Sequence, residues 1–347
     1  MRYRAHLEDV LTTGLGSSVF EFLTLAAMPF TLATSHSFET LSRERIASLL
    51  PIARKVFEVY TINPKEFSST KIVDLENVGE NVFESALRDE GVRFLSSGLK
   101  TGALMSLEVL HLTYNRITKI GMNFLLSTGT LTSLKHLNLC ANELFDDGLV
   151  AFSHHSGALS SLEILDISNN SIGPRGMVSF SLYLSEGSLP QLVDLRMCNN
   201  KFGNEGMIAF GRAVRSGYLC NLTKLSASNV NMQSSGMFAL NMSLPHMPVL
   251  EGMTLCFNDL EEYGLRTFVE VVFNTGCLAK LNYLDVSHHG IRGANTAFML
   301  LSEAISHDFL PSLRYIGLTD YDEGDEEPIF IVKPLTEACL NRDITIE

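Results

Sequence analysis

Histidines are the first residues whose type suggests metal or proton chemistry, and four of the ten stand in adjacent pairs. The pairs are His154-His155 and His288-His289. Two histidines that bind one metal ion from a helix normally stand four positions apart, because that spacing puts both rings on one face. Adjacent histidines lack this spacing. We therefore expect no metal site at either pair, and we expect the first pair to be solvated.

Cysteine offers nucleophilic, redox or metal chemistry, and the chain has six. Cys140, Cys198 and Cys256 share one position of a repeated pattern, in alternate copies. If the copies stack as neighbouring strands about 4.8 Å apart, these thiols lie about 10 Å from one another, which is too far for a disulfide. No C-x-x-C pair occurs. Unpaired thiols favour a reducing compartment.

Other catalytic signatures are missing from the sequence. The acidic run Asp320–Glu327 lacks the alternating ligands and terminal glutamate of a calcium loop, so we expect a solvated loop. There is no phosphate-binding G-x-x-x-x-G-K-[ST] and no nucleophile elbow G-x-S-x-G. We therefore predict a protein that is not an enzyme, with no catalytic residue, no cofactor and no metal ion.

A pattern that recurs along most of the chain must position these residues. It is clearest at 162–172, which reads L-x-x-L-x-L-x-x-N-x-L and is followed by Gly176 and an apolar run. A fixed period of this kind indicates a stack of similar units. The copies begin at Leu107, Leu134, Leu162, Leu192, Leu222, Leu250, Leu281 and Leu313, spaced 27 to 32 residues apart, with a weaker copy at Val73–Leu75.

Each copy predicts a short strand followed by a helix. Leu165 and Ile167 alternate to one face of the strand, and Asn170 follows where its amide can bond backbone groups of neighbouring copies. The apolar residues of 176–184 have helical spacing. One unit cannot bury its leucines alone, so the copies must stack.

The pattern resembles the leucine-rich repeat family in its ribonuclease-inhibitor-like subtype, over roughly residues 70 to 320. The resemblance implies an α/β solenoid with a curved parallel sheet inside and helices outside. We assign residues 70–347 to this domain, including a C-terminal cap with a helix at Pro334–Leu340 and a strand at Ile344–Ile346. Residues 1–69 do not follow the repeat and predict a helical N-terminal cap, since the open end of a solenoid must be covered.

The N-terminal region supports a second interpretation. Phe20–Leu25 reads F-x-F-L-x-L, and Ser35–Leu41 reads S-x-S-F-x-x-L. These segments resemble a degenerate F-box. That resemblance implies a substrate receptor of a ubiquitin ligase, with the adaptor subunit of the ligase as a partner.

Three copies lack the inward asparagine. Val230, His289 and Tyr321 stand at its position. Valine cannot bond backbone groups, so either Asn229 or Asn231 takes over this role or the ladder is locally looser. A buried polar group left unmet would cost about 1–3 kcal/mol.

The residues that alternate with the inward leucines form the concave face of the predicted sheet. Tyrosine and arginine are favoured interface anchors, so we expect this face to bind a protein partner. The alternative is a merely solvated face with partners elsewhere. The candidate binding residues are His111, His136, Asn138, Asp166, Asp194, Arg196, Lys224, Tyr283, Asp285 and Tyr315.

Net charge and apolar segments restrict the partners and the compartment. The net charge of −13 disfavours nucleic acid and anionic membranes, which attract clustered lysine and arginine. Glu8, Asp9 and Glu21 interrupt any signal-peptide core. The apolar stretch Phe22–Ala33 is shorter than a membrane span. We expect an intracellular protein, in the cytoplasm or the nucleus.

These observations predict a non-catalytic protein recognition or scaffold module. Besides the ubiquitin-ligase receptor, a second alternative is an activator of small GTPases, which some ribonuclease-inhibitor-like repeat proteins are. That activity would require an arginine and an asparagine in the loops after the strands. Arg116 beside Asn115 is the pair that fits.

Overall fold

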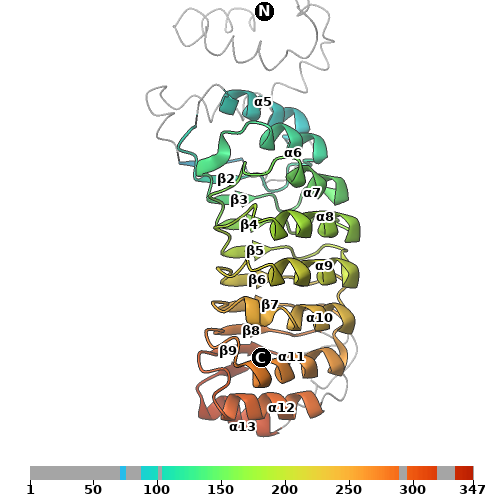
Figure 1. The fold of residues 1–347 in the computed structure, drawn as a ribbon, viewed down its shortest axis with the longest axis vertical. Helices are drawn as coiled ribbons and strands as arrows, with labels where there is room; N and C mark the ends of the chain where they lie inside the picture. The colour runs from blue at the N-terminus through green and yellow to red at the C-terminus, as the bar shows by residue number, and fades with distance from the viewer. Residues whose placement is uncertain (1–70, 76–86, 101–103, 289–294, 319–332, 347) are drawn as a thin grey trace, which may run out of the picture.

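The computed structural model describes residues 71–75, 87–100, 104–288, 295–318 and 333–346. In these ranges ten short strands form one parallel sheet, and each strand pairs with the next along the chain (Figure 1). The F-box-like segment, His289 and the acidic run at 320–327 lie outside the described residues. The strands are β1 (Ile72–Asp74), β2 (Val109–His111), β3 (His136–Asn138), β4 (Ile164–Asp166), β5 (Asp194–Arg196), β6 (Lys224–Ser226), β7 (Gly252–Thr254), β8 (Tyr283–Asp285), β9 (Tyr315–Gly317) and β10 (Thr345–Ile346).

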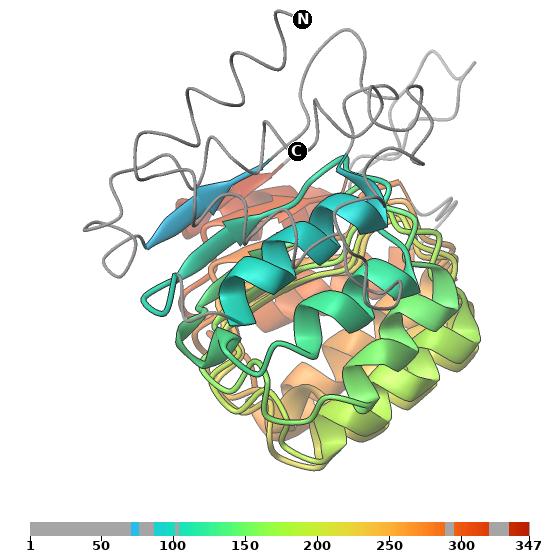
Figure 2. The same ribbon diagram turned by 90° about the horizontal axis from the view of Figure 1, so that it is seen from above.

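A helix follows each strand from β1 to β9 and packs on the same side of the sheet (Figure 2). Short 3-10 turns at Leu131–Ser133 and Leu244–His246 complete two of the rungs. The α/β solenoid predicted from the repeat is therefore confirmed. The helices are α5 (Arg88–Lys100), α6 (Lys119–Leu126), α7 (Phe145–Ser153), α8 (Pro174–Ser185), α9 (Gly203–Arg215), α10 (Ser234–Asn241), α11 (Glu261–Thr275), α12 (Asn295–Ser306) and α13 (Lys333–Asn341).

The register of the sheet follows the leucine pattern. Leu165, the central residue of β4, pairs with Leu137 of β3 and Leu195 of β5. These three side chains and Ile167 are all fully buried against the helices. Because the strand period is two, the first and third residues of each strand face away from the helices.

The inward asparagines form a ladder between rungs. The Nδ2 group of Asn170 donates to the carbonyls of Leu139 in the preceding rung, at 2.9 Å, and of Ile167 in its own, at 3.1 Å. The Oδ1 atom of Asn200 in the next rung accepts from the N–H groups of Asn170 and Ile172. The predicted role of the asparagine is confirmed.

The ladder is interrupted at Val230. An asparagine at position 230 would accept hydrogen bonds from the backbone N–H groups of Asn200 and Phe202 through its side-chain oxygen. With valine there, neither N–H group has an acceptor within the described ranges. Asn229 does not replace it, because its Nδ2 group donates to the side chain of Asn199 at 2.9 Å. Strands β5 and β6 nevertheless keep their full register. Only the side-chain ladder is looser, which was the second predicted alternative.

Alternate helices are capped by the rung before them. Asp146 in α7 accepts hydrogen bonds from Gly173 and Gly176 of the next rung through one carboxylate oxygen. This satisfies N–H groups that a helix start leaves unpaired. The repeat pattern did not predict this alternation. Asp89 does the same for Thr118 and Gly121, and Asn204 for Gln233 and Gly236.

Candidate protein-binding face

All ten candidate residues lie on the face of the sheet opposite the helices, called here the concave face. Each occupies the first or third position of its strand, as alternation predicts. Their exposure differs, however. Lys224 and Tyr283 are exposed, whereas Asp166 and Asp194 are buried by their neighbours on the same face. The face is therefore a packed polar surface, and its binding role stays a prediction.

The middle of the concave face holds an ion pair. Arg196 Nη2 donates to Asp194 Oδ2 at 2.7 Å, and its Nε lies 3.2 Å from both carboxylate oxygens. The Asp194 side chain is 6% exposed and that of Arg196 43%, so the guanidinium covers the carboxylate. The hydrogen bond to Asp194 raises the pKa of Arg196. Beside it, Asp166 accepts from the Ser168 N–H at 2.9 Å.

Two histidines meet near the N-terminal end of the face. The rings of His111 and His136 touch edge to face, with centroids 4.9 Å apart. Burial lowers the pKa of His136, and the nearby His111 and Arg196 add to this effect. His111 Nδ1 lies 3.8 Å from Asp74 Oδ2. The Nε2 atoms of both histidines are buried without a partner in the described part of the chain.

The C-terminal end of the face carries a stacked tyrosine pair. The rings of Tyr283 and Tyr315 are almost parallel, at 5°, with centroids 4.5 Å apart. Asp285 lies on the same strand as Tyr283, and its Oδ1 accepts from the Ser287 hydroxyl at 2.7 Å. The Asp285 carboxylate lies against Gly317, because a Cβ there would stand 2.6 Å from Asp285 Oδ1.

A second stacked pair, Phe257 and His288, was not predicted from the sequence. The rings of Phe257 and His288 lie 4.3 Å apart at 6°, just beyond the ends of β7 and β8. Both residues have positive φ, 56° and 58°. They occupy equivalent positions in consecutive copies, and that shared position was the signal available in the sequence.

The cysteines of the face are thiols. Cys256 Sγ donates to Ser228 Oγ at 3.0 Å, and the Ser228 N–H donates to Cys198 Sγ at 3.4 Å. Burial raises the pKa of both thiols, which makes them poor nucleophiles near neutral pH. All six cysteines are free, as expected. Within the described residues, no group of three or more His, Cys, Asp or Glu side chains is placed to hold a metal ion.

Asn138 and Arg116 form hydrogen bonds with neighbouring groups of the solenoid. Asn138 Oδ1 accepts from the Cys140 N–H at 2.9 Å, so part of its amide is committed to its own strand end. Arg116, the candidate of the GTPase hypothesis, donates through Nε to Glu143 at 2.8 Å. His154 is exposed at the end of α7, as predicted, whereas His155 is partly buried and its pKa is lowered by that burial.

Comparison with known proteins agrees with this geometry. A family model described as Leucine Rich repeat matches residues 103–126 and 158–181. The chain carries leucine-rich repeats. Proteins of this family generally mediate protein–protein interactions and are typically non-enzymatic. The ribonuclease-inhibitor-like subtype and the F-box resemblance stay predictions.

Structural and curated comparisons add little beyond the family. The structure of internalin C2 from Listeria monocytogenes is similar, with 16% sequence identity and a TM-score of 0.42 over 68% of this chain and 83% of that chain. A comparison with curated proteins gives no match. None of the described helices has both the length and the apolar content needed to cross a bilayer.

Proposed function

We propose that this leucine-rich repeat protein is a non-catalytic recognition or scaffold module that holds a protein partner on its concave face. The stacked pair of Tyr283 and Tyr315 is the observation that supports this most directly. Tyr283 is 37% exposed although its ring is large, and Asp285 beside it has no cationic partner among the described residues. Rigid aromatic surface next to a polar group is typical of interface hot spots.

Preorganisation of the central ion pair also supports binding. Arg196 and Asp194 already fix each other, so a partner that contacts them loses little additional side-chain entropy. The tyrosine rings fix each other in the same way through their stack. The concave face thus offers two ordered features, one in its middle and one at its C-terminal end.

Affinity purification of the full chain followed by mass spectrometry tests the proposal. The double variant Tyr283→Ala/Tyr315→Ala should lose the specific partner that the unchanged protein captures. The matched control is Tyr218→Ala/Tyr263→Ala, since those rings are 52% and 46% exposed and lie off the strands of the sheet. Equal recovery of the partner by both double variants would refute binding on the concave face.

The ubiquitin-ligase receptor is the first alternative, and it depends on residues 19–41, outside the described ranges. A ligase adaptor would then be a partner of the N-terminal region in addition to any partner on the concave face. Pull-down of the full chain with the adaptor subunit tests the ubiquitin-ligase alternative. If the adaptor does not bind, the cap interpretation of residues 1–69 stands.

The GTPase-activator alternative has less support. Arg116 is tied to Glu143, and Asn115 is fully buried, where it donates to the Leu75 carbonyl at 2.8 Å. Neither side chain is free to reach a bound nucleotide in this arrangement. Stimulated GTP hydrolysis across a panel of small GTPases, lost in Arg116→Ala, would restore this alternative.

A further inference from the structure

A groove of about 610 Å³ lies at the edge of the solenoid, where the strands lead into the helices. Its walls come from four consecutive rungs, at 118–120, 143–147, 171, 173–175 and 201. None of the ten candidate residues of the concave face lines it. The groove is therefore a separate surface, formed by the loops before α6, α7, α8 and α9 and by the first residues of α6, α7 and α8.

Two large apolar side chains are exposed at this groove. Ile120 and Phe145 are each 51% exposed, and they come from neighbouring rungs. Phe145 has φ of +50°, a conformation that is costly for a bulky residue. Gly203 begins α9 with nearly the same φ, +54°. Glycine takes this conformation without strain. Arg88 and Glu261 begin α5 and α11 with the same conformation, at 53° and 54°, so an exposed aromatic ring at this position is specific to α7 among these four helices.

The three carboxylates at the groove are already committed. Glu143 accepts from Arg116 at 2.8 Å, and Asp147 accepts from Lys119 at 2.8 Å. Asp146 accepts from two backbone N–H groups of the next rung. Their negative charges are balanced or fixed within the protein.

The two remaining cations of the groove have no such partner. Arg175 and Lys201 are exposed, and neither forms an ion pair with any residue that the structure describes, although the charge of Arg175 contributes to lowering the pKa of Asp147. The lining residues include three cations and three carboxylates, and Arg116, which pairs with Glu143 beside the groove, adds a fourth cation. Four cations against three carboxylates give one net positive charge beside apolar surface, on a chain whose net charge is −13. A local excess of positive charge selects negatively charged groups.

We propose that this groove binds an extended segment of a partner protein that carries both carboxylate and large apolar side chains. Arg175 and Lys201 receive the carboxylates, while Ile120 and Phe145 contact the apolar side chains. Apolar anchors beside complementary charge are a general feature of protein recognition sites. This binding is independent of the concave face, so the two surfaces can hold different partners or two parts of one partner.

Fluorescence anisotropy with the full chain tests the proposal. The probes are three labelled, capped peptides of equal length, alternating Glu with Phe, Glu with Ala, and Lys with Phe. We expect the Glu/Phe peptide to bind at least about tenfold more tightly than the other two, since it alone satisfies both features of the groove. Its affinity should fall as salt is added, because exposed charges are screened. Equal affinity for the Lys/Phe peptide would overturn the proposal.

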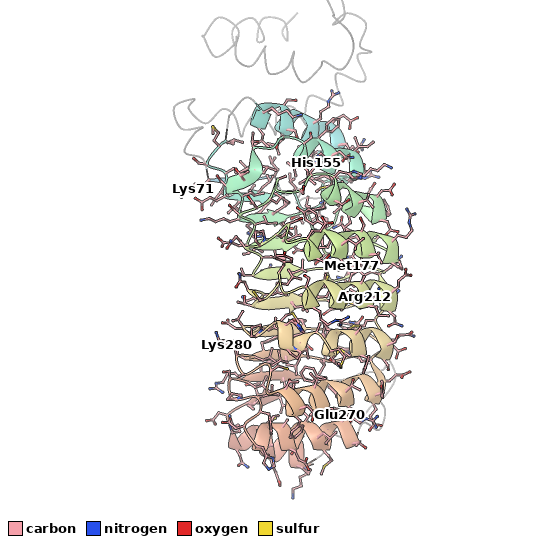
Figure 3. The ribbon with its side chains drawn as sticks, viewed as in Figure 1. Lys71, His155, Met177, Arg212, Glu270 and Lys280 are labelled. Atoms are coloured by element: carbon pink, nitrogen blue, oxygen red, sulfur yellow. The ribbon has the colours of Figure 1, made fainter. Side chains whose placement is uncertain are left out.

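Matched variants locate the binding. Arg175→Glu/Lys201→Glu should weaken the Glu/Phe peptide by about tenfold or more, whereas Arg212→Glu/Lys280→Glu, at exposed cations elsewhere (Figure 3), should leave it within about twofold. Arg212 and Lys280 thus control for the change in net charge. Equal weakening by both double variants would show non-specific attraction and refute the site.

The aromatic contact has its own control. Phe145→Asn should weaken the Glu/Phe peptide while keeping the fold, because asparagine tolerates positive φ. Phe257→Asn is the matched control, since Phe257 is also exposed, at 57%, with φ of +56°, but lies four rungs further along the solenoid. If both variants bind the peptide as the unchanged protein does, the apolar half of the proposal is wrong.

Discussion

A hydrogen bond between Asp146 and Gly176 joins the first turn of α7 to the first turn of α8. The Asp146 Oδ1 atom accepts the Gly176 N–H at 2.9 Å and the Gly173 N–H at 2.7 Å. A Cβ at position 176 would lie 2.7 Å from the Asp146 Cα, so glycine is required for this approach. The recurring glycine of the repeat therefore serves contact between rungs.

Asp146→Ala is expected to lower the free energy of unfolding by about 1–2 kcal/mol, because two N–H groups at the start of α8 lose their acceptor. Urea denaturation followed by circular dichroism measures this change. The adjacent Asp147→Ala is the control, since Asp147 is exposed and pairs with the exposed Lys119 side chain instead of capping a helix. A loss as large in Asp147→Ala would contradict the capping role.

Val230→Asn is expected to raise the free energy of unfolding by about 1 kcal/mol, because the side-chain oxygen of the asparagine would accept hydrogen bonds from the N–H groups of Asn200 and Phe202. Asparagine is smaller than valine and should fit the buried position. The measurement is the shift of the urea midpoint at unchanged slope. Val230→Ala is the control, and it should destabilise the protein by removing buried apolar surface. A Val230→Asn variant as unstable as Val230→Ala would show that the gap is not a missing acceptor.

Stability should fall as pH falls below the ordinary histidine pKa of 6.5. Burial, together with His111 and Arg196, lowers the pKa of folded His136, so the unfolded chain binds its proton at a higher pH than the folded chain does. The loss begins near pH 6.5 and continues until the lowered folded pKa is reached. Denaturation midpoints at pH 7.5 and 5.5 should differ less in His136→Gln. Part of the slope should persist, because burial also lowers the pKa of His155. An unchanged pH dependence would exclude His136 as a source.

Arg196→Ala is expected to cost about 1 kcal/mol of stability, since it leaves the Asp194 carboxylate buried without its cation. The expected loss of stability is small because the Arg196 side chain is 43% exposed and solvent screens the ion pair. The double variant Arg196→Ala/Asp194→Ala should recover most of the loss, because no buried charge then remains. Additive losses in the double variant would mean that the two residues act independently.

The architecture was predictable from the sequence because one repeated pattern has one way to bury its leucines. Leu165 and Ile167 must turn inward in every copy, and only stacking hides them. The same alternation placed Tyr283 and Arg196 on the concave face. The C-terminal helix was expected at Pro334–Leu340 and runs from Lys333 to Asn341, and the last strand was also found.

What the repeat could not determine is how side chains of neighbouring rungs meet. Tyr283 and Tyr315 are 32 residues apart, and their stack depends on rotamers and on the offset between β8 and β9. The cap from Asp146 to Gly176 likewise depends on how closely α7 approaches α8. The groove with Phe145, Arg175 and Lys201 joins loops that no single copy contains. Periodicity determines which face a side chain occupies, whereas contacts between rungs follow from packing in three dimensions.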